Sequence, residues 1–305
     1  MDLAMTEKIV SSNDTVLKML EQVNHVASSN FSIVIQGESG TGKATLAHII
    51  HNLGKRAGMP FITVDIDAIP ESLIEDELFG YEKGVFEMAY GGTILIAGIQ
   101  KLSPYVQTKI LRVIEEKRVY HLGSTRAVET DARIIASTTV DLKRAVSEKT
   151  FREDLFLSLC EHVITIPPLR ERPEDIEYLA NIFFAEACSE LGKDICKITA
   201  GTMDILKKHL WKGNIRELKN VIRRAVILCN DNTLKPEHIE FISSKANGPD
   251  FLPQEDAPLL SLRDMEKFAI KRALDLTNGK KTKAAALLEI DYKTLVRKIK
   301  DYNIQ

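Results

Sequence analysis

A glycine-rich segment near the start of the chain has the residue types and spacing of a phosphate-binding loop. Residues 37–43 read Gly-Glu-Ser-Gly-Thr-Gly-Lys, which fits G-x-x-x-x-G-K between an apolar run and a helical pattern. Glycines let backbone N–H groups turn towards a phosphate, the helix adds its positive dipole end, and Lys43 adds a charge. An incidental glycine turn is the weaker alternative. We predict nucleotide contacts from Gly37, Glu38, Ser39, Gly40, Thr41, Gly42, Lys43 and Ala44.

Residues that could contact DNA gather at the C-terminal end. Residues 259–305 hold 11 Lys and Arg against 6 Asp and Glu, whereas the rest of the chain is acidic. A short helix over 282–288, a turn, and a helix over 292–302 have the spacing of a helix-turn-helix, whose second helix enters the major groove. A solvated basic hairpin is the alternative. The predicted DNA contacts are Lys281, Thr282, Tyr292, Lys293, Thr294, Arg297 and Lys298.

The elements that must position these residues follow an α/β pattern and then an all-helical one. Short apolar runs predict buried strands, helical stretches separate them, and this alternation indicates a mostly parallel sheet covered on both faces. After Pro167 and Pro168 the pattern is helical only. The predicted strands are 31–35, 61–64, 93–96 and 133–136, and the predicted domains are 1–170 (α/β), 171–243 (helical), 244–258 (linker) and 259–305 (DNA-binding).

Composition excludes several classes of protein. The 305 residues are 44% hydrophobic and 28% charged, which is ordinary for a globular chain with a core. No apolar run approaches the ~20 residues that span a bilayer, and the start of the chain has no signal-peptide layout. The four cysteines form no C-x-x-C pair, and His48 and His51 have no evident third partner. We therefore expect a cytoplasmic protein with no membrane segment and no metal site of its own.

Several longer motifs resemble the ATPase domain of the bacterial enhancer-binding proteins, the NtrC-type AAA+ activators of sigma-54 RNA polymerase. The C-terminal segment resembles the Fis-type DNA-binding domain of the same family. The resemblance implies an AAA+ P-loop NTPase with a parallel-sheet core and a helical lid, ATP or ADP as cofactor, and double-stranded DNA and RNA polymerase holoenzyme as partners. Besides 37–43, the motifs that carry it are 77–84, 151–155, 168–172 and 211–218.

The resemblance also assigns two arginines and an assembly. Arg216 matches the family's sensor II arginine, which contacts the nucleotide. Arg152 matches one of two arginines that reach the phosphate bound by a neighbouring subunit, but the second of these positions is Ser158. We expect a homo-oligomer, with a dimer formed through the C-terminal tail. Because Ser158 replaces the second arginine, the sequence does not decide whether a hexameric ring also forms.

The residues that the family uses for hydrolysis are largely replaced. Its second nucleotide motif ends in Asp-Glu, where Asp helps hold Mg²⁺ and Glu polarises the attacking water. This chain has Ala97 and Gly98 there, Ala44 where a hydroxyl could reach Mg²⁺, and Thr139 at the sensor asparagine. We expect nucleotide binding without hydrolysis and assign no catalytic residue. The alternative is an active ATPase in which Asp65 or Asp67 stands in for the missing acids and sigma-54 polymerase is remodelled.

The loop that contacts sigma-54 in the family is also altered. The family pattern is Gly-Ala-Phe-Thr-Gly-Ala, whereas residues 84–89 read Gly-Val-Phe-Glu-Met-Ala and lead almost directly to Gly91 and Gly92. The protruding insertion is therefore expected to be missing. We predict a sequence-specific DNA-binding transcription regulator that acts independently of sigma-54. A regulator that responds to a cyclic dinucleotide such as cyclic di-GMP is a further alternative.

Overall fold

The chain forms two compact units, residues 1–241 and residues 242–305. The predicted linker at 244–258 and most of the first part of the predicted DNA-binding domain lie outside the described residues. Within the described part of the chain, no helix combines the length and apolar character needed to cross a membrane. The computed structural model describes residues 11, 13–80, 84–121, 127–193, 197–229, 233–241, 270, 273–274, 277, 281–288 and 290–302.

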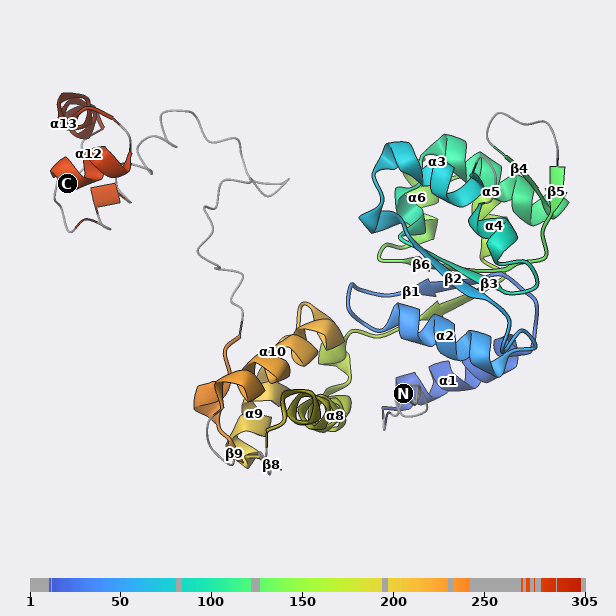
Figure 1. Cartoon of the computed structure of the whole chain (residues 1–305), viewed down its shortest axis with the longest axis horizontal. Helices are drawn as coiled ribbons and strands as arrows, with labels where there is room; N and C mark the ends of the chain where they lie inside the picture. Colours follow the sequence, from blue (N-terminus) through green and yellow to red (C-terminus); the bar gives the residue numbers. More distant parts are fainter. Residues whose placement is uncertain are drawn as a thin grey trace. The chain divides into compact units, whose positions relative to one another are not determined.

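The first unit is built on a five-stranded parallel sheet with the strand order β2-β3-β6-β1-β7 (Figure 1). Short helices η2 (Ile66–Ala68), η3 (Ile99–Lys101) and η4 (Leu169–Glu171) follow three of its strands. The other elements up to the last strand are α1 (Asp14–Ala27), β1 (Ile33–Gln36), α2 (Lys43–Leu53), β2 (Phe61–Asp65), α3 (Glu71–Phe79), α4 (Val85–Met88), β3 (Thr93–Ala97), α5 (Pro104–Glu116), β4 (Arg118–Tyr120), β5 (Ala127–Glu129), β6 (Arg133–Thr138), α6 (Leu142–Ser147), α7 (Glu153–Leu159) and β7 (His162–Thr165).

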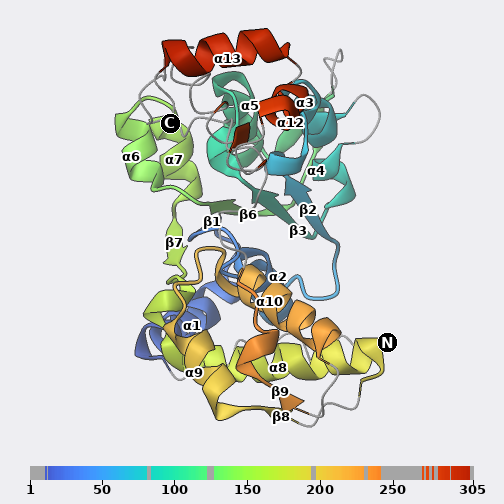
Figure 2. The ribbon, with the colours of Figure 1, turned by 90° about the vertical axis from the view of Figure 1, so that its left-hand side faces the viewer.

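Helices cover both faces of this sheet, as the sequence predicts. Successive strand residues point to opposite faces, so Ile33 and Ile35 join one core while Val34 joins the other. Helices α1 and α2 pack on the first face, and α3 to α7 pack on the second (Figure 2). All six residues of β6 are buried because this strand is central. The four predicted strands are confirmed as β1, β2, β3 and β6.

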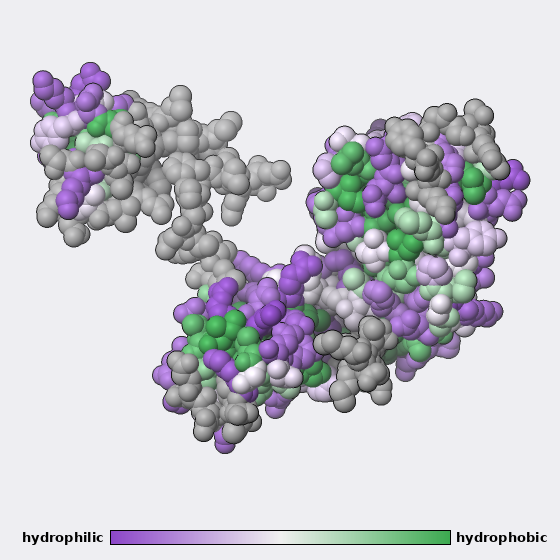
Figure 3. Space-filling model, in the orientation of Figure 1, coloured by the Kyte–Doolittle hydropathy of each residue, from purple (hydrophilic) through white to green (hydrophobic). Residues whose placement is uncertain are grey.

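A helical subdomain, which we call the lid (residues 173–241), completes the first unit. Pro173 starts its first helix and Gly192, at φ +60°, ends it. Trp211 is fully buried and donates its indole N–H to the Leu206 carbonyl at 2.8 Å. Figure 3 shows hydrophobic residues gathering on the lid surface. The lid elements are α8 (Pro173–Leu191), β8 (Lys197–Ile198), α9 (Ala200–Lys208), α10 (Asn214–Leu228), β9 (Thr233–Leu234) and η5 (Pro236–His238).

The expectation that this region is helical only is wrong in one detail. Lys197 and Ile198 pair in parallel with Thr233 and Leu234, and this two-residue ladder joins the entry of α9 to the end of the lid. Leu234 is fully buried in the lid core. Two residues are too few to show strand periodicity, so the sequence carried no signal for this pair.

The second unit contains the predicted helix-turn-helix. Its two fully described helices are α12 (Lys281–Leu287) and α13 (Tyr292–Asp301). Ala284 and Ala285 let the helices approach closely, and Leu295 of α13 is fully buried against them. Ile290, between the helices, donates its N–H to the Ala285 carbonyl at 3.1 Å. The two helices and their turn therefore share one small core.

The segment that would carry the family's sigma-54 loop is folded into the core of the first unit. Phe86 of α4 is fully buried and stacks on Phe79, with ring centroids 5.9 Å apart. Its carbonyl accepts a hydrogen bond from the buried Thr130 hydroxyl at 2.9 Å. Gly92 then donates its N–H to Ala89, so the chain turns directly into β3. The segment 84–92 is a tight connection that supports the sheet.

We expect Phe86→Ala to lower the free energy of unfolding by about 3–5 kcal/mol, because it leaves a cavity in a closely packed core. Urea unfolding measures this change. Met88→Ala is the matched control, since Met88 is 50% exposed on the same helix, and its effect should stay within about 0.5 kcal/mol. Equal effects of the two variants would contradict the buried position of this segment.

Candidate nucleotide-binding site and nucleic-acid interface

The predicted phosphate-binding loop (P-loop, residues 37–44) connects β1 to α2. Gly40 and Gly42 have φ of +77° and +101°, which L side chains rarely adopt. At Gly40 a Cβ atom would also lie 2.3 Å from the Gly213 carbonyl oxygen. These glycines are therefore required both by the loop conformation and by the close approach of the lid.

Lys43 at the start of α2 lies over the P-loop. Its ammonium donates hydrogen bonds to the carbonyls of Gly37 at 2.7 Å and Glu38 at 2.8 Å. Burial lowers the pKa of Lys43, the charge of Arg216 lowers it further, and Asp67 opposes the shift. Lys43 and Arg216 thus bring two positive charges to the same loop, an arrangement suited to an anion.

Asn214, the first residue of α10, joins the lid to the P-loop. The residue is fully buried and has φ of +53°, a conformation that Asn tolerates better than most residues. Its side-chain oxygen accepts the N–H of Leu169 at 2.8 Å. Its amide nitrogen donates to the Ser39 carbonyl at 3.0 Å and to the Glu38 carboxylate at 3.1 Å. One buried amide therefore connects the loop, the hinge before α8 and the lid helix.

Arginines add further contacts across this junction. Arg170 holds the Glu38 carboxylate with two hydrogen bonds of 2.6 and 2.8 Å. These bonds and the one from Asn214 lower the pKa of Glu38 to about 2. The buried Arg172 donates to the Thr41 carbonyl at 3.2 Å. Arg216 donates to the Ser39 hydroxyl at 3.3 Å, so the structure brings this distant residue to the predicted loop.

The family carries its catalytic acids at the end of β3. In this chain that strand end is surrounded by Asp65, Asp67 and Lys101. Asp65 pairs with Ala97 in the β2–β3 ladder, as expected for acids at the end of a neighbouring strand. Asp67 follows on η2, and its carboxylate would lie 3.0 Å from a Cβ atom placed on Gly98. Lys101 forms an ion pair with this carboxylate at 2.7 Å. Carboxylates at this corner therefore come from β2 and its extension.

Arg152, the predicted inter-subunit arginine, is partly exposed at the start of α7. Its guanidinium binds Asp154, two residues further along the chain, with an Nε–Oδ1 distance of 2.9 Å. Its backbone N–H donates to Gln107 of α5 at 2.9 Å, which fixes the beginning of α7. The side chain is accessible, and its inter-subunit role stays a prediction.

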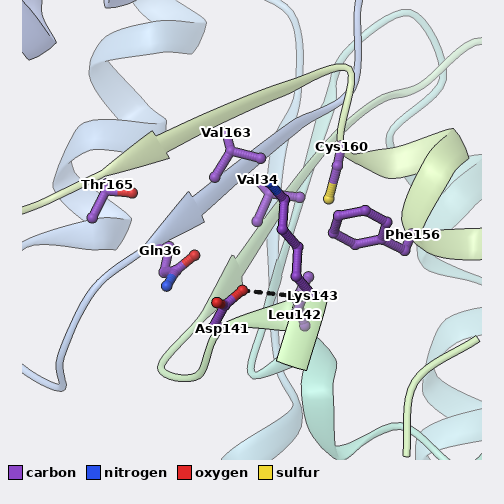
Figure 4. Close-up of a pocket in the computed structure, with 9 residues that line it drawn as sticks. All are labelled: Val34, Gln36, Asp141, Leu142, Lys143, Phe156, Cys160, Val163 and Thr165. Atoms are coloured by element: carbon purple, nitrogen blue, oxygen red, sulfur yellow. Dashed lines mark hydrogen bonds between the residues drawn. The ribbon is translucent and has the colours of Figure 1, made fainter. Parts of the chain in front are cut away.

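A pocket of about 250 Å³ lies between strands β1 and β7 and helices α6 and α7 (Figure 4). The carboxylate of Asp141 accepts the backbone N–H of Lys143 at 2.9 Å and is thereby used as a helix cap. Burial raises the pKa of the Cys160 thiol to about 11, so this thiol stays protonated at neutral pH. None of the lining residues belongs to the P-loop; they are Val34, Gln36, Asp141, Leu142, Lys143, Phe156, Cys160, Val163 and Thr165.

Helix α13 of the second unit exposes a basic face. Lys293 and Arg297 are exposed and lie one turn apart, opposite the buried Leu295. Tyr292 is 50% exposed, and Thr294 and Lys298 are half-buried. On α12, Lys281 is exposed, whereas the side chain of Thr282 lies outside the part of the chain that the structure describes. The arrangement suits a recognition helix whose first turns meet DNA.

The parallel sheet, the P-loop beneath a helical lid and the helix-turn-helix define the class of AAA+ transcription regulators. Residues 9–165 match the family model of the sigma-54 interaction domain, and residues 170–249 match the AAA+ ATPase lid domain. Residues 261–302 match the Fis family of bacterial regulatory proteins. The chain belongs to the sigma-54 interaction domain family of transcriptional regulators, the enhancer-binding proteins.

Curated relatives and a solved structure agree with this assignment. Regulatory protein AtoC of Escherichia coli is 37% identical over 97% of this chain and 68% of that protein. NtrC of Azospirillum brasilense is 33% identical over 97% of this chain and 70% of that protein. The crystal structure of NtrX from Brucella abortus in complex with ATP is 30% identical, with a TM-score of 0.75 over 98% of this chain and 70% of that one.

Three residues whose side chains form hydrogen bonds with the P-loop were not among the predicted contacts, namely Arg170, Arg172 and Asn214. Arg170 and Asn214 lie in the motifs 168–172 and 211–218, but the sequence assigned only Arg216 from these motifs to the nucleotide site. Their direct partner is Glu38 of the P-loop, which lies 132 and 176 residues away along the chain. The motifs themselves were the available signal.

We expect the destabilising effect of Glu38→Gln to disappear in acid. A carboxylate with a lowered folded-state pKa stabilises the fold above its unfolded pKa, and the contribution is lost as pH falls from 4.5 to about 2. The loss at neutral pH should be about 1 kcal/mol or less, because the ion pair is partly exposed. Urea unfolding of both proteins across this pH range measures it. A difference that stays constant with pH would contradict the ion-pair assignment.

Proposed function

We propose that this protein is a sequence-specific DNA-binding transcription regulator whose AAA+ module binds ATP or ADP without hydrolysing it. One observation carries the proposal: the P-loop and its lid contacts are complete, whereas β3 ends at Ala97 and Gly98 follows it. Phosphate binding needs the loop and its lysine, but hydrolysis needs an acid that positions water. The chain has the loop and its lysine, and it has Ala97 and Gly98 where the family carries its acids, which supports binding without hydrolysis.

Nucleotide binding is supported by the charges at the P-loop. Lys43 and Arg216 approach the loop from the sheet and from the lid. Solved structures of NtrX from Brucella abortus, which is 30% identical to this chain, are complexes with ATP and with ADP, and this supports nucleotide binding. Arg170 and Arg172, which lie just before the lid and could otherwise serve a cyclic dinucleotide, are engaged by Glu38 and by the Thr41 carbonyl. This geometry favours a mononucleotide.

The groups that could replace the lost acids are engaged elsewhere. Asp65 accepts the N–H of Asp67 at 3.1 Å and thereby caps η2. Asp67 is held by Lys101, and Thr139 accepts a hydrogen bond from Gln100 at 3.2 Å. Placing an attacking water requires a correctly oriented base, and a displacement of about 1 Å can cost ~100-fold in rate. These contacts support a module that has lost hydrolysis.

Independence from sigma-54 is supported by the buried position of Phe86. In the family a protruding loop contacts sigma-54, but in this chain the corresponding segment 84–92 packs beneath the sheet. We propose that the protein acts with RNA polymerase holoenzyme carrying another sigma factor, or by occluding a promoter. The predicted dimer through the tail would present two recognition helices to two half-sites.

We expect the wild-type chain to bind ATP and ADP without turnover, and Lys43→Ala to weaken binding at least ~10-fold, or about 1.4 kcal/mol. Isothermal titration calorimetry measures binding, and phosphate release measures turnover. Lys18→Ala, which removes an exposed lysine of α1, is the control for loss of one charge.

Two results would contradict the proposal. Turnover on the order of 1 s⁻¹ or faster is typical of a working enzyme. Open complexes formed by sigma-54 polymerase upon addition of this protein and ATP would show that the missing loop is dispensable.

We expect Arg297→Ala to weaken binding to the selected operator by about 1–3 kcal/mol, roughly 5- to 150-fold, and to relax specificity at one base position. The operator is first selected from random duplex DNA with the wild-type chain. Lys300→Ala removes one charge from the last turn of the same helix. It should weaken binding to all DNA sequences by a similar factor. Wild-type affinity and specificity in Arg297→Ala would show that α13 is not the recognition helix.

A further inference from the structure

The nucleotide site lacks the oxygen ligands that would hold Mg²⁺ on the protein. Mg²⁺ demands near-octahedral oxygen coordination, and P-loop proteins supply it from a Ser or Thr hydroxyl after the lysine and from a strand-end acid. Here Ala44 follows Lys43, and β3 ends at Ala97 and Gly98 follows it. These positions offer no side-chain oxygen, so the residues at the usual ligand positions do not fit the metal.

The carboxylate of Asp67 lies at this end of β3, but it is already paired with Lys101. Asp67 Oδ1 lies 3.0 Å from where a Cβ atom on Gly98 would be, so the carboxylate borders the vacated acid position. Lys101 Nζ lies 2.7 Å from the same oxygen. The short helix η3 places Lys101 three residues after Gly98, and the Lys101 N–H donates to the Gly98 carbonyl at 3.0 Å. The pair is therefore held by the backbone that replaces the lost acids.

Electrostatics connect this pair to the P-loop. The charge of Asp67 raises the pKa of Lys43 against the larger effect of burial, so the carboxylate acts on the phosphate-binding lysine. The hydrogen bond to Asp67 raises the pKa of Lys101, and Asp65 adds to the effect. Lys101 is thus a cation at neutral pH. Both side chains of the pair are about half exposed, so the ammonium is accessible from solvent.

We propose that Lys101 serves as the fixed cation of the nucleotide site, keeping Asp67 out of metal coordination so that ATP and ADP bind as metal-free anions. The inference rests on the proposed nucleotide binding. Lys43 and Arg216 supply two positive charges at the loop, and Lys101 neutralises the Asp67 carboxylate, which would otherwise repel the phosphates. A bound Mg²⁺ would have to displace Lys101 from Asp67 and would itself neutralise part of the phosphate charge that the lysines attract.

Calorimetry of the full chain with ATP and ADP, in excess EDTA and in millimolar MgCl₂, tests the proposal. The wild-type chain should bind ATP and ADP in EDTA either as tightly as in MgCl₂, within about twofold, or more tightly. Lys101→Met should weaken ATP binding in EDTA by ~5-fold or more. It should also release Asp67 for a metal. Binding by this variant should then strengthen on addition of MgCl₂.

A direct measurement of the metal and a matched control variant add evidence that does not depend on nucleotide affinity. Electron paramagnetic resonance of Mn²⁺ should detect no protein ligand to the ion in the wild-type chain with ATP, and a protein-bound ion in Lys101→Met. Lys207→Met removes an exposed lysine that pairs with Glu177 at 2.6 Å in the lid, and it should behave as wild type.

The outcomes separate the inference from the proposed function. Wild-type binding that tightens about tenfold or more in MgCl₂, or a protein-bound Mn²⁺ in the wild-type chain, would overturn the metal-free mode and leave nucleotide binding intact. Lys101→Met behaving like Lys207→Met would overturn the role of Lys101. An absence of ATP and ADP binding in both buffers would overturn the proposed nucleotide function as well.

Discussion

The close approach of the lid to the P-loop is the constraint on which the nucleotide site depends. Only glycine fits at position 40, because a Cβ atom there would lie 2.3 Å from the Gly213 carbonyl. The buried amide of Asn214 then satisfies a loop carbonyl and a hinge N–H that would otherwise be left unpaired, at a cost of roughly 1–3 kcal/mol each. Because this contact fixes the start of α10, it also places Arg216 at the loop.

Binding and hydrolysis are carried by separate elements of such a fold, so one can be lost without the other. The phosphates are held by the loop between β1 and α2, whereas the catalytic acids of the family end β3. In this chain β3 remains a buried inner strand that pairs along its whole length with β2 and β6. Ala97 and Gly98 therefore remove carboxylates without disturbing the sheet. Phe86, in the segment where the family carries its sigma-54 loop, is likewise buried and stacks on Phe79 in the core of the first unit.

These features are consistent with a protein in which a nucleotide acts as a ligand and the output is DNA binding. The second unit has its own small core around Leu295, with its basic residues on the opposite side of α13. The nucleotide site in turn is shared between the sheet and the lid through Glu38, Arg170 and Asn214. In the proposed function, the nucleotide binds at this junction, and the predicted dimer presents two recognition helices to DNA.

The sequence by itself determined the elements and sites that are contiguous along the chain. Continuous apolar runs predicted the inner strands β1, β3 and β6, because strands covered on both faces bury nearly every residue, and a similar run predicted the edge strand β2. The P-loop is one segment whose glycines reveal its conformation. The edge strand β7 was not predicted, and its His162 and Thr165 leave only two apolar residues in the strand, whereas the other edge strand, β2, carries the apolar residues Phe61, Ile62 and Val64. Only the tertiary structure showed that Arg170 and Asn214 contact Glu38, and that Lys101 forms an ion pair with Asp67. Such pairs depend on how strands and helices pack against one another. They could not be predicted, because the spacing of residues in the sequence indicates only which residues are neighbours within one turn or one strand.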